Sequence, residues 1–268
     1  MSAACTLAPP HPRTSAPPFA KASAGQALAP VLAIISWNLN AGRGNLAALT
    51  ADLASGRLTG VPPREFVLLL QEASDPEAGL AAALGQVESR HLSAAFAPVR
   101  DLDGRPGGNA ILATVPLAGI RTIALPRERQ PRAAVVAEIA IDGHPLFLVS
   151  VHLENRISWW RGGLFSDTAR GRQATALVDA LPAAADGILG GDLNTWLGPA
   201  ERAWQLLNGR FKDLPASPRD RTFQNRLPLD HVLFDLPPDW TAERRVVPNA
   251  YGSDHHPVLG LVFPRPRI

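Results

Sequence analysis

Short apolar runs recur along the chain from residue 31 onward, and they predict a succession of buried β-strands. The first two runs are rich in β-branched and aliphatic side chains. Later runs are separated by glycine, proline or charged residues, and Asp142–Gly143 predicts a tight turn between two of them. The predicted strands cover residues 31–37, 66–70, 109–115, 119–125, 133–141, 146–151, 188–189, 232–234 and 258–262.

Other segments have the spacing of amphipathic helices. Asn45 is placed to cap a helix whose apolar face holds Leu46, Leu49 and Leu53, and Pro76 suits the first turn of a second helix. Strands and helices alternate irregularly without internal repeats, which predicts one mixed α/β domain. The predicted helices after the first cover residues 77–86, 168–181 and 201–207.

Residues 1–30 show neither periodicity. They are rich in Ala, Pro and Ser, and the first acidic residue of the chain is Asp52. Such a segment cannot bury enough apolar surface to offset its ordering entropy, so we expect a flexible tail followed by a folded domain over 31–268. The tail lacks the basic-then-apolar order of a secretory signal, although its few cations and missing acids faintly resemble a transit peptide. We expect a cytoplasmic protein.

The composition excludes several classes of protein but does not indicate a binding partner. Of the 268 residues, 46% are apolar and 19% charged, which suits a folded core and argues against disorder. No run approaches the ~18 apolar residues of a membrane span. The formal net charge of +2 is too small to indicate nucleic acid by itself. Lys21 and Lys212 are the only lysines; the remaining basic residues are arginines, which suit phosphate but also arise from genome composition. The single Cys5 excludes a disulfide framework and a Cys-ligated zinc site.

Polar side chains gather at the ends of the predicted strands, where ligands bind in open sheets. They are carboxylates, amides and imidazoles, a set that suits a hard, oxygen-preferring cation such as Mg²⁺ or Mn²⁺ and leaves histidines for proton transfer or phosphate contact. The tracts are Trp37-Asn38-Leu39-Asn40, Gln71-Glu72, Ser150 to Glu154, Gly190 to Asn194, Leu229-Asp230-His231 and Ser253 to Pro257.

Each of these residues also has an ordinary structural interpretation. An aspartate after Gly-Gly, as at Asp192, is more often a turn residue. Glu72 also suits the cap of a turn, and His152 suits a satisfied core position. The tract around Asp254 and His255 is more particular, because the following proline stiffens the exit from the loop.

Taken in order, these motifs resemble the endonuclease/exonuclease/phosphatase superfamily, whose members include pancreatic-type deoxyribonucleases, abasic-site endonucleases, neutral sphingomyelinases and inositol-polyphosphate 5-phosphatases. The resemblance runs from about residue 32 to 263. It implies a four-layer α/β sandwich, with two mixed β-sheets face to face and helices outside. The ordered series is Trp-Asn-Leu-Asn, Leu-Gln-Glu, Gly-Asn-Ala-Ile-Leu, Val-His-Leu, Gly-Asp-Leu-Asn, Leu-Asp-His and Ser-Asp-His-His-Pro.

The resemblance also implies a role for each matching residue. Glu72 is the main ligand of Mg²⁺ or Mn²⁺, helped by Asn38 and Asp254. Asp192 orients or deprotonates the attacking water, and Asn194 contacts the phosphate.

Two histidines complete this implied site. Asp230 fixes the tautomer of His255 and favours its charged form, and His152 donates to the phosphoryl oxygens. A cation, a carboxylate and two imidazoles provide the charge neutralisation, activated water and leaving-group stabilisation that phosphate-ester hydrolysis requires.

Further candidates for substrate binding match the superfamily less closely. Asn109 lies in a tract near the phosphate or else only caps a strand. Arg170, in an Arg-x-x-Gln pattern, reaches the substrate phosphate or else lies at a solvated helix end. His231 and His256 are predicted to be structural.

Paired tryptophans follow His152 in a loop without clear precedent. Trp159 and Trp160 suit stacking on a base or sugar, insertion into a lipid interface, or simple packing at the sandwich edge.

The substrate class is the least determined part of this interpretation. Abasic-site endonucleases carry a Val-Pro-Asn-like tract where this chain has Val151-His152-Leu153, which favours the deoxyribonuclease, sphingomyelinase and phosphatase branches. We expect hydrolysis of phosphodiesters, first of nucleic acid, with a lipid-headgroup or inositol-phosphate ester as the alternative. We expect a monomer without an obligate protein partner. A catalytically dead binding protein would lack Glu72, Asp192, Asp230 or His255, and all four are present.

Deletion of residues 1–29 tests the predicted tail. The truncated chain should keep the melting temperature and activity of the full chain, because a segment of this composition makes few buried contacts. Thermal unfolding of both chains checks this expectation, and a large loss of stability would show that the segment docks on the domain.

Overall fold

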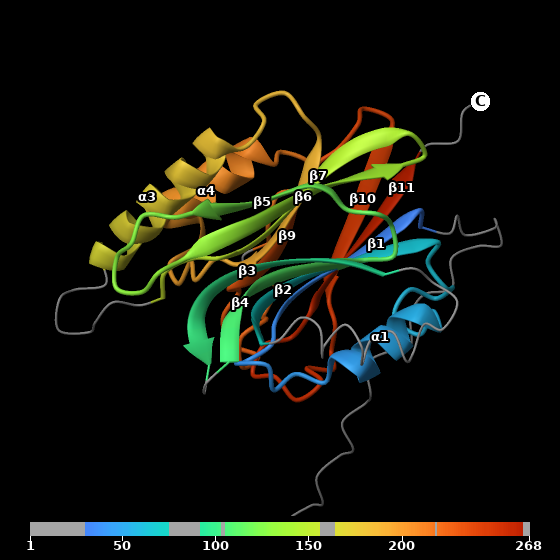
Figure 1. The fold of residues 1–268 in the computed structure, drawn as a ribbon, viewed down its shortest axis with the longest axis horizontal. Helices are drawn as coiled ribbons and strands as arrows, with labels where there is room; N and C mark the ends of the chain where they lie inside the picture. Colours follow the sequence, from blue (N-terminus) through green and yellow to red (C-terminus); the bar gives the residue numbers. More distant parts are fainter. Residues whose placement is uncertain (1–29, 75–91, 103–104, 156–163, 218, 265–268) are drawn as a thin grey trace, which may run out of the picture.

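The computed structural model describes residues 30–74, 92–102, 105–155, 164–217 and 219–264 (Figure 1). The predicted tail up to residue 29, the predicted helix over 77–86 and the Trp159–Trp160 loop lie outside these residues. Pro30, which the sequence pattern placed in the tail, is buried.

Two mixed β-sheets form the centre of the structure. The first contains β1 (Leu32–Asn38), β2 (Glu65–Ser74), β3 (Ser93–Leu102), β4 (Arg105–Ala113), β10 (Trp240–Val246) and β11 (Val258–Pro264), in the order β10-β11-β1-β2-β4-β3. The second contains β5 (Ala118–Ala124), β6 (Ala133–Ile141), β7 (His144–His152), β8 (Gly187–Asp192) and β9 (Asp230–Asp235), in sequence order. The pairs β1–β2 and β7–β8 are parallel, and the others are antiparallel.

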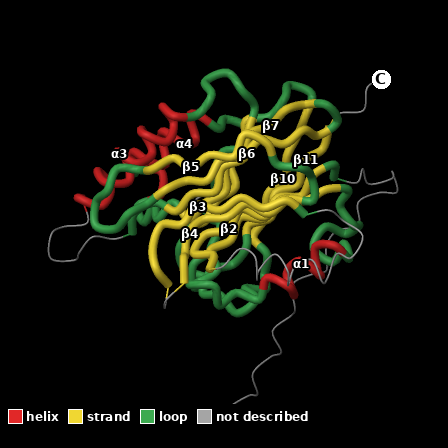
Figure 2. Tube along the Cα trace, viewed as in Figure 1, coloured by secondary structure: helices red, strands yellow, loops and turns green. Residues whose placement is uncertain are grey.

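The sheets pack face to face, and helices cover their outer faces (Figures 1 and 2). Helix α1 (Leu46–Ala54) covers the first sheet, while α3 (Leu164–Ala180) and α4 (Arg202–Arg210) cover the second. One apolar cluster fills the space between the sheets, and each of two others lies between a sheet and its helices. The short 3₁₀ helix η1 (Gly198–Ala200) precedes α4. The predicted four-layer α/β sandwich is therefore confirmed.

Local sequence signals account for much of this layout. Asn45 caps α1 by accepting a hydrogen bond from the Ala48 N–H at 3.0 Å. Asp142 and Gly143 both have positive φ in the turn between β6 and β7, as a tight hairpin requires. Of the described helices, none is long and apolar enough to cross a membrane.

Two strands, β3 and β10, were missed by the apolar pattern. Both lie at the outer edges of the first sheet. Pro98 interrupts β3, and β10 carries Glu243, Arg244 and Arg245. Proline and charge protect edge strands from pairing with other chains, and they also remove the continuous apolar run that a sequence pattern detects.

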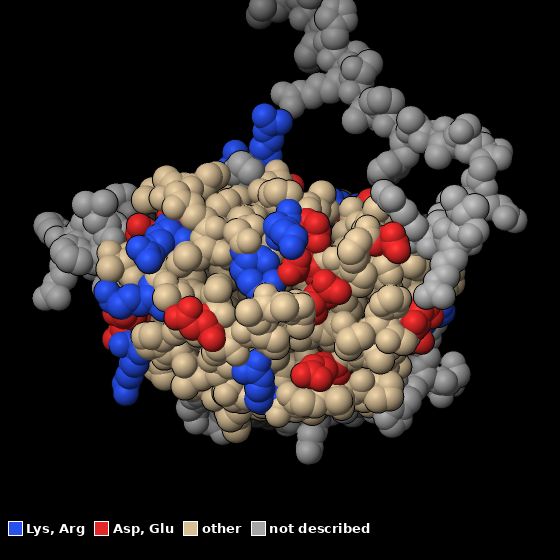
Figure 3. Space-filling view, turned by 90° about the horizontal axis from the view of Figure 1, so that it is seen from above, with Lys and Arg blue, Asp and Glu red and all other residues tan. Residues whose placement is uncertain are grey.

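Charged side chains of both signs occur on one face of the molecule. On the face drawn in Figure 3, acidic and basic side chains lie among one another and form no continuous basic stripe. This agrees with the small net charge of the chain.

Gly190 allows the two sheets to approach closely beside the strand ends. A Cβ atom on this residue would lie 2.7 Å from Leu69 Cδ1 and 2.9 Å from Ser36 Cβ, both in the opposite sheet. The Gly-Gly pair before Asp192 is thus part of a buried strand and not the turn that such a sequence more often forms.

Substitution of Gly190 by alanine tests this close approach. Because the added methyl group overpacks the space between the sheets, Gly190→Ala should lower the free energy of unfolding by about 1–3 kcal/mol. Gly209→Ala in α4 is the matched control, since a Cβ there meets no atom within 4 Å. Denaturant titrations compare the two variants, and equal stability would contradict the packing argument.

Candidate active site

Three neighbouring strands of the second sheet end with ionisable side chains. In the strand register His152 pairs with Asp192, and Asp192 pairs with Asp230. The three residues therefore lie side by side at one end of β7, β8 and β9. The ends of β1 and β2 in the first sheet bring Asn38 and Glu72 to the same place.

Asp192 lies at the centre of this arrangement, and both of its carboxylate oxygens accept hydrogen bonds. Oδ2 accepts from Asn38 Nδ2 at 3.0 Å, across the gap between the sheets, and Oδ1 accepts from the Asn194 N–H at 3.0 Å. Asn194 adopts a φ of +50°, a conformation that is uncommon for a non-glycine residue. The carboxylate is thus held from both sheets.

Glu72 is directed toward the pocket by an irregularity in its strand. The β2–β4 pairing shifts register between Leu70 and Ala73, and Glu72 has a φ of +52°. Its Oε2 accepts a hydrogen bond from the Ala41 N–H at 2.9 Å. Since Asn40 and Ala41 also have positive φ, the backbone strain of this part of the chain is concentrated around Glu72.

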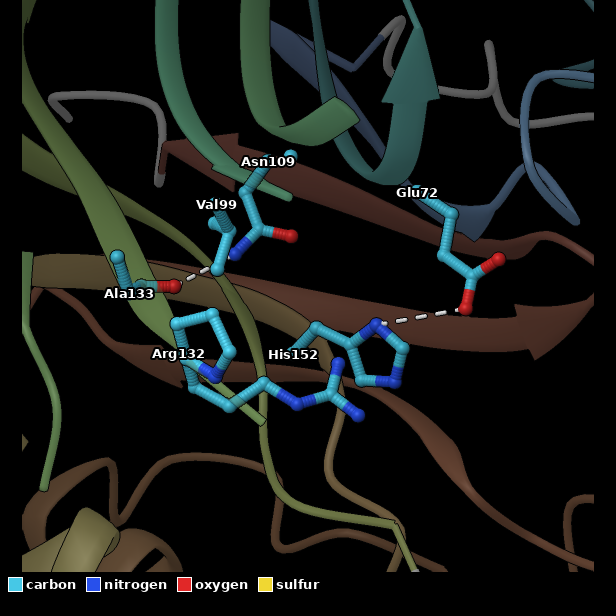
Figure 4. A pocket seen from close by; sticks show the side chains of 8 residues that line it. Glu72, Val99, Asn109, Arg132, Ala133 and His152 are labelled. Atoms are coloured by element: carbon cyan, nitrogen blue, oxygen red, sulfur yellow. Dashed lines mark hydrogen bonds and ion pairs between the residues drawn. The ribbon is translucent and has the colours of Figure 1, made fainter. Parts of the chain in front are cut away.

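The two histidines lie on either side of these carboxylates. His255 Nδ1 is 2.7 Å from Asp230 Oδ2, and its Nε2 is 3.9 Å from Asp192 Oδ2. His152 Nε2 is 3.5 Å from Asp192 Oδ2, and its Nδ1 is 3.8 Å from Glu72 Oε1 (Figure 4). His152 therefore links Glu72 to Asp192, and His255 links Asp192 to Asp230.

Burial and mutual charge set the proton affinities. Burial, reinforced by the charge of Asp230, raises the pKa of Asp192 to about 7. Burial by itself would lower the pKa of His255, but the charge and hydrogen bond of Asp230 outweigh it and raise this pKa to about 10. The Asp230 carboxylate therefore favours the charged form of His255, and burial favours the neutral form of Asp192.

These side chains line a pocket of about 330 Å³. All the predicted metal ligands and all the predicted catalytic residues except Asp230 lie on its wall, while Asp230 is buried behind His255. A cavity of about 20 Å³ adjoins it between Glu72, Asn109, Arg132 and His152 (Figure 4). The pocket lining comprises Asn38, Asn40, Glu72, His152, Asn155, Asp192, Asn194, Trp196, Phe223, Leu229, Asp254 and His255.

The two looser candidates differ in position. Asn109 lines the small cavity, and its Nδ2 donates to the Ala133 carbonyl at 2.6 Å, which ties β4 to β6. Arg170 is only 1% exposed and does not line the pocket. Its guanidinium pairs with Glu201 at 2.7 Å and donates to the Glu154 carbonyl. Arg170 is therefore not at a solvated helix end.

The sequence patterns did not single out several buried residues whose hydrogen bonds position the site. Glu154 is fully buried and accepts hydrogen bonds from the backbone N–H groups of Arg129, Gln130 and Asn155. Thr222 Oγ1 accepts from the N–H groups of residues 229 and 230, which fixes the start of β9. Glu154 lies in a strand-end tract and was detectable there, but nothing in the local sequence marks Thr222.

The remaining histidines of this region are structural, as predicted. His256 Nδ1 bonds the Val247 carbonyl at 3.0 Å. The His231 ring meets Trp204 edge-on at 4.8 Å, and burial lowers its pKa to about 4.

The comparisons with known proteins agree with this geometry. The sequence model of the Endonuclease/Exonuclease/phosphatase family matches residues 35–255, and the chain belongs to this family. No curated protein matches the sequence.

Solved structures show the same fold at low sequence identity. An endonuclease/exonuclease/phosphatase from Beutenbergia cavernae superposes with a TM-score of 0.67 at 16% identity, covering 87% of this chain and 72% of that one. The human Nocturnin catalytic domain with bound sulfate anion gives 0.60 at 17%, covering 88% and 95%. Sphingomyelinase C from Streptomyces griseocarneus gives 0.56 at 18%, covering 87% and 99%.

The buried neutral His231 predicts acid sensitivity of the fold. Its pKa of about 4 lies below the ~6.5 of an unfolded histidine. The unfolded chain therefore binds the proton more readily. The contribution of His231 to the free energy of unfolding is fully present above pH 6.5 and decreases as pH falls toward 4, by up to about 1.4 kcal/mol per pH unit. His231→Phe should flatten this part of the stability–pH curve. Urea unfolding at several pH values measures it, and an unchanged slope would show that other groups cause the loss.

Proposed function

We propose that this chain is a divalent-metal-dependent phosphoesterase that hydrolyses phosphodiester bonds. The observation that carries the proposal is the convergence of Glu72, Asp192 and His255 in one pocket, where His255 Nδ1 lies 2.7 Å from the buried Asp230 carboxylate. Fold alone does not establish an activity, because one fold hosts many chemistries. The side-chain geometry is the stronger support.

The donor set of the pocket fits a hard cation. Glu72, Asp254 and Asn38 offer carboxylate and amide oxygens, and these would hold Mg²⁺ or Mn²⁺. When bound, such an ion neutralises charge on the phosphoryl and leaving oxygens. Ligand atoms of Asp192, Asp230 and His255 also lie within 4.8 Å of one another. We assign this second group to proton transfer, because the 2.7 Å His255–Asp230 contact is already a hydrogen bond.

The remaining side chains have distinct tasks in the proposed reaction. Asp192 accepts a proton from water as the water oxygen bonds to phosphorus and the ester P–O bond breaks. Asp230 holds the Nδ1 proton of His255, so that Nε2 donates toward the phosphoryl oxygens. His152, between Glu72 and Asp192, donates to the same group of oxygens.

The finer part of the proposal names nucleic acid as the substrate. Its support is that two aromatic side chains line the pocket beside the charged groups, since aromatic rings suit stacking on a base. A lipid-headgroup or inositol-phosphate ester is the alternative. Plasmid DNA, sphingomyelin, phosphatidylinositol phosphates and inositol phosphates, assayed in parallel, distinguish these substrates.

Glu72→Gln tests the reaction class. Because few protein ligands hold Mg²⁺, loss of this charge should reduce hydrolysis of bis-p-nitrophenyl phosphate by at least ~100-fold and abolish any rise in melting temperature with Mg²⁺. Glu138→Gln, on the exposed face of β6, is the matched control and should behave as wild type. Chelator should inhibit the wild type. If Glu72→Gln retains both activity and the Mg²⁺ effect, the metal assignment is wrong.

A further inference from the structure

The loop between β10 and β11 carries two residues of the pocket wall, Asp254 and His255. We call residues 247–257 the catalytic loop. It lies beside the connection from β1 to α1 (Figure 1), and the N–H of Asn45 donates to the Tyr251 carbonyl at 2.7 Å. The loop is therefore docked on a segment from the other end of the chain.

The inner part of the catalytic loop is bound to the end of β1. Ser253 Oγ donates to the Asn38 carbonyl at 2.7 Å and accepts a hydrogen bond from the His255 N–H at 3.0 Å. Trp37 is fully buried, and its Nε1 donates to the His255 carbonyl at 3.0 Å. The backbone position of His255 is thus set by the strand that carries Asn38.

Tyr251 anchors the outer part of the loop to α1. Its hydroxyl donates to Asp52 Oδ2 at 2.8 Å, and its ring meets that of Trp37 with centroids 6.0 Å apart at 69°. Burial and the hydrogen bond to Asp52 raise the pKa of Tyr251, so the hydroxyl keeps the proton that it donates. Asp52 also forms an ion pair with Arg57, whose side chain is exposed.

Tyr251 makes these contacts from a strained backbone conformation. Its φ is +49°, in the left-handed region that suits glycine or asparagine and is an outlier for a bulky side chain. Such a conformation persists only where surrounding contacts fix it, and it occurs preferentially at functional sites. Asn249 Oδ1 fixes the backbone by accepting from the Tyr251 N–H at 2.9 Å, and the ring and hydroxyl hold the side chain.

We infer that Tyr251 is a positioning residue, whose hydrogen bond to Asp52 latches the catalytic loop onto α1 and thereby fixes Asp254 and His255 at the pocket. The inference rests on the proposed function and gives α1 a part in it. Of the described residues that line the pocket, none belongs to this helix. A displacement of about 1 Å in a reacting group can slow catalysis by about 100-fold, so a distant anchor affects the rate.

Kinetics of four variants test the latch. Tyr251→Phe removes only the hydroxyl and should lower kcat for bis-p-nitrophenyl phosphate about tenfold with KM nearly unchanged, because the positioned groups act in the transition state. Asp52→Ala should cause the same loss. The double variant should lose no more than either single variant, because both remove one interaction. Asp52→Asn should retain most of the rate, since its amide oxygen still accepts the hydrogen bond.

Two matched controls separate the latch from stability. Arg57→Gln removes the exposed ion pair of Asp52 but leaves the hydrogen bond from Tyr251, and it should behave as wild type. Thr114→Val removes a buried hydroxyl that accepts from the Phe66 N–H at 2.9 Å, near the start of β2 and away from the catalytic loop. It should lower the melting temperature and leave kcat unchanged.

Hydrogen exchange provides a measurement that needs neither metal nor activity. In the full chain, Tyr251→Phe and Asp52→Ala should speed amide exchange in the catalytic loop about tenfold or more, because a hydrogen bond to a carboxylate no longer opposes local opening. Exchange in β6 and β7 should not change. Thr114→Val should not produce this change confined to the loop.

The outcomes separate this inference from the proposed function. A wild-type kcat in Tyr251→Phe, or unchanged exchange of the catalytic loop in both latch variants, overturns the inference. An equal loss of kcat in Thr114→Val also overturns it, because the effect would then follow general stability. Absence of metal-dependent hydrolysis by the wild type overturns the reaction class instead, and the exchange rates still decide whether Tyr251 and Asp52 hold the loop.

Discussion

The hydrogen bond from Asn38 Nδ2 to Asp192 Oδ2 joins the ends of the two sheets, and the pocket forms where these ends meet. It is one of several polar contacts between the sheets at this end, together with Gln71–Ser150 and Asn109–Ala133. Farther from the site the sheets contact each other through an apolar cluster. Apolar burial provides the non-directional attraction, and the polar contacts select one alignment of the strand ends. The contacts that cross between the sheets, such as Glu72–His152 and Asn38–Asp192, depend on that alignment.

This alignment confines two carboxylates, Asp192 and Asp230, to a buried region, which costs free energy unless positive charge or hydrogen bonds offset it. The positive charge of His255 offsets part of this cost. The side-chain amide of Asn38 and the backbone N–H of Asn194, which donate hydrogen bonds to Asp192, offset a further part. Positive φ at Glu72 and Asn194 adds local strain. The site therefore combines several features that lower stability, as expected where function opposes stability.

Residues behind the pocket maintain this arrangement without touching a ligand. Glu154 accepts hydrogen bonds from backbone N–H groups in the connection before β6. The pair of Arg170 and Glu201 holds the turn after Asn194. These are buried charges with specific partners, so truncation of one leaves the other uncompensated. Their effect on a bound group would come through the position of neighbours such as Trp196.

The sequence by itself determined the alternation of strands and helices, the cap at Asn45, the hairpin turn at Asp142–Gly143 and the polar residues at the strand ends, because each is a local pattern of burial or backbone conformation. The sequence pattern did not predict the edge strands β3 and β10, because the proline and charged residues that protect a sheet edge also interrupt the apolar run. Only the tertiary structure decided that Gly190 lies between the sheets, that Arg170 pairs with Glu201, and that Trp196 and Phe223 meet beside His255. Those contacts join residues distant along the chain, and the packing of two sheets, which no local pattern encodes, brings them together.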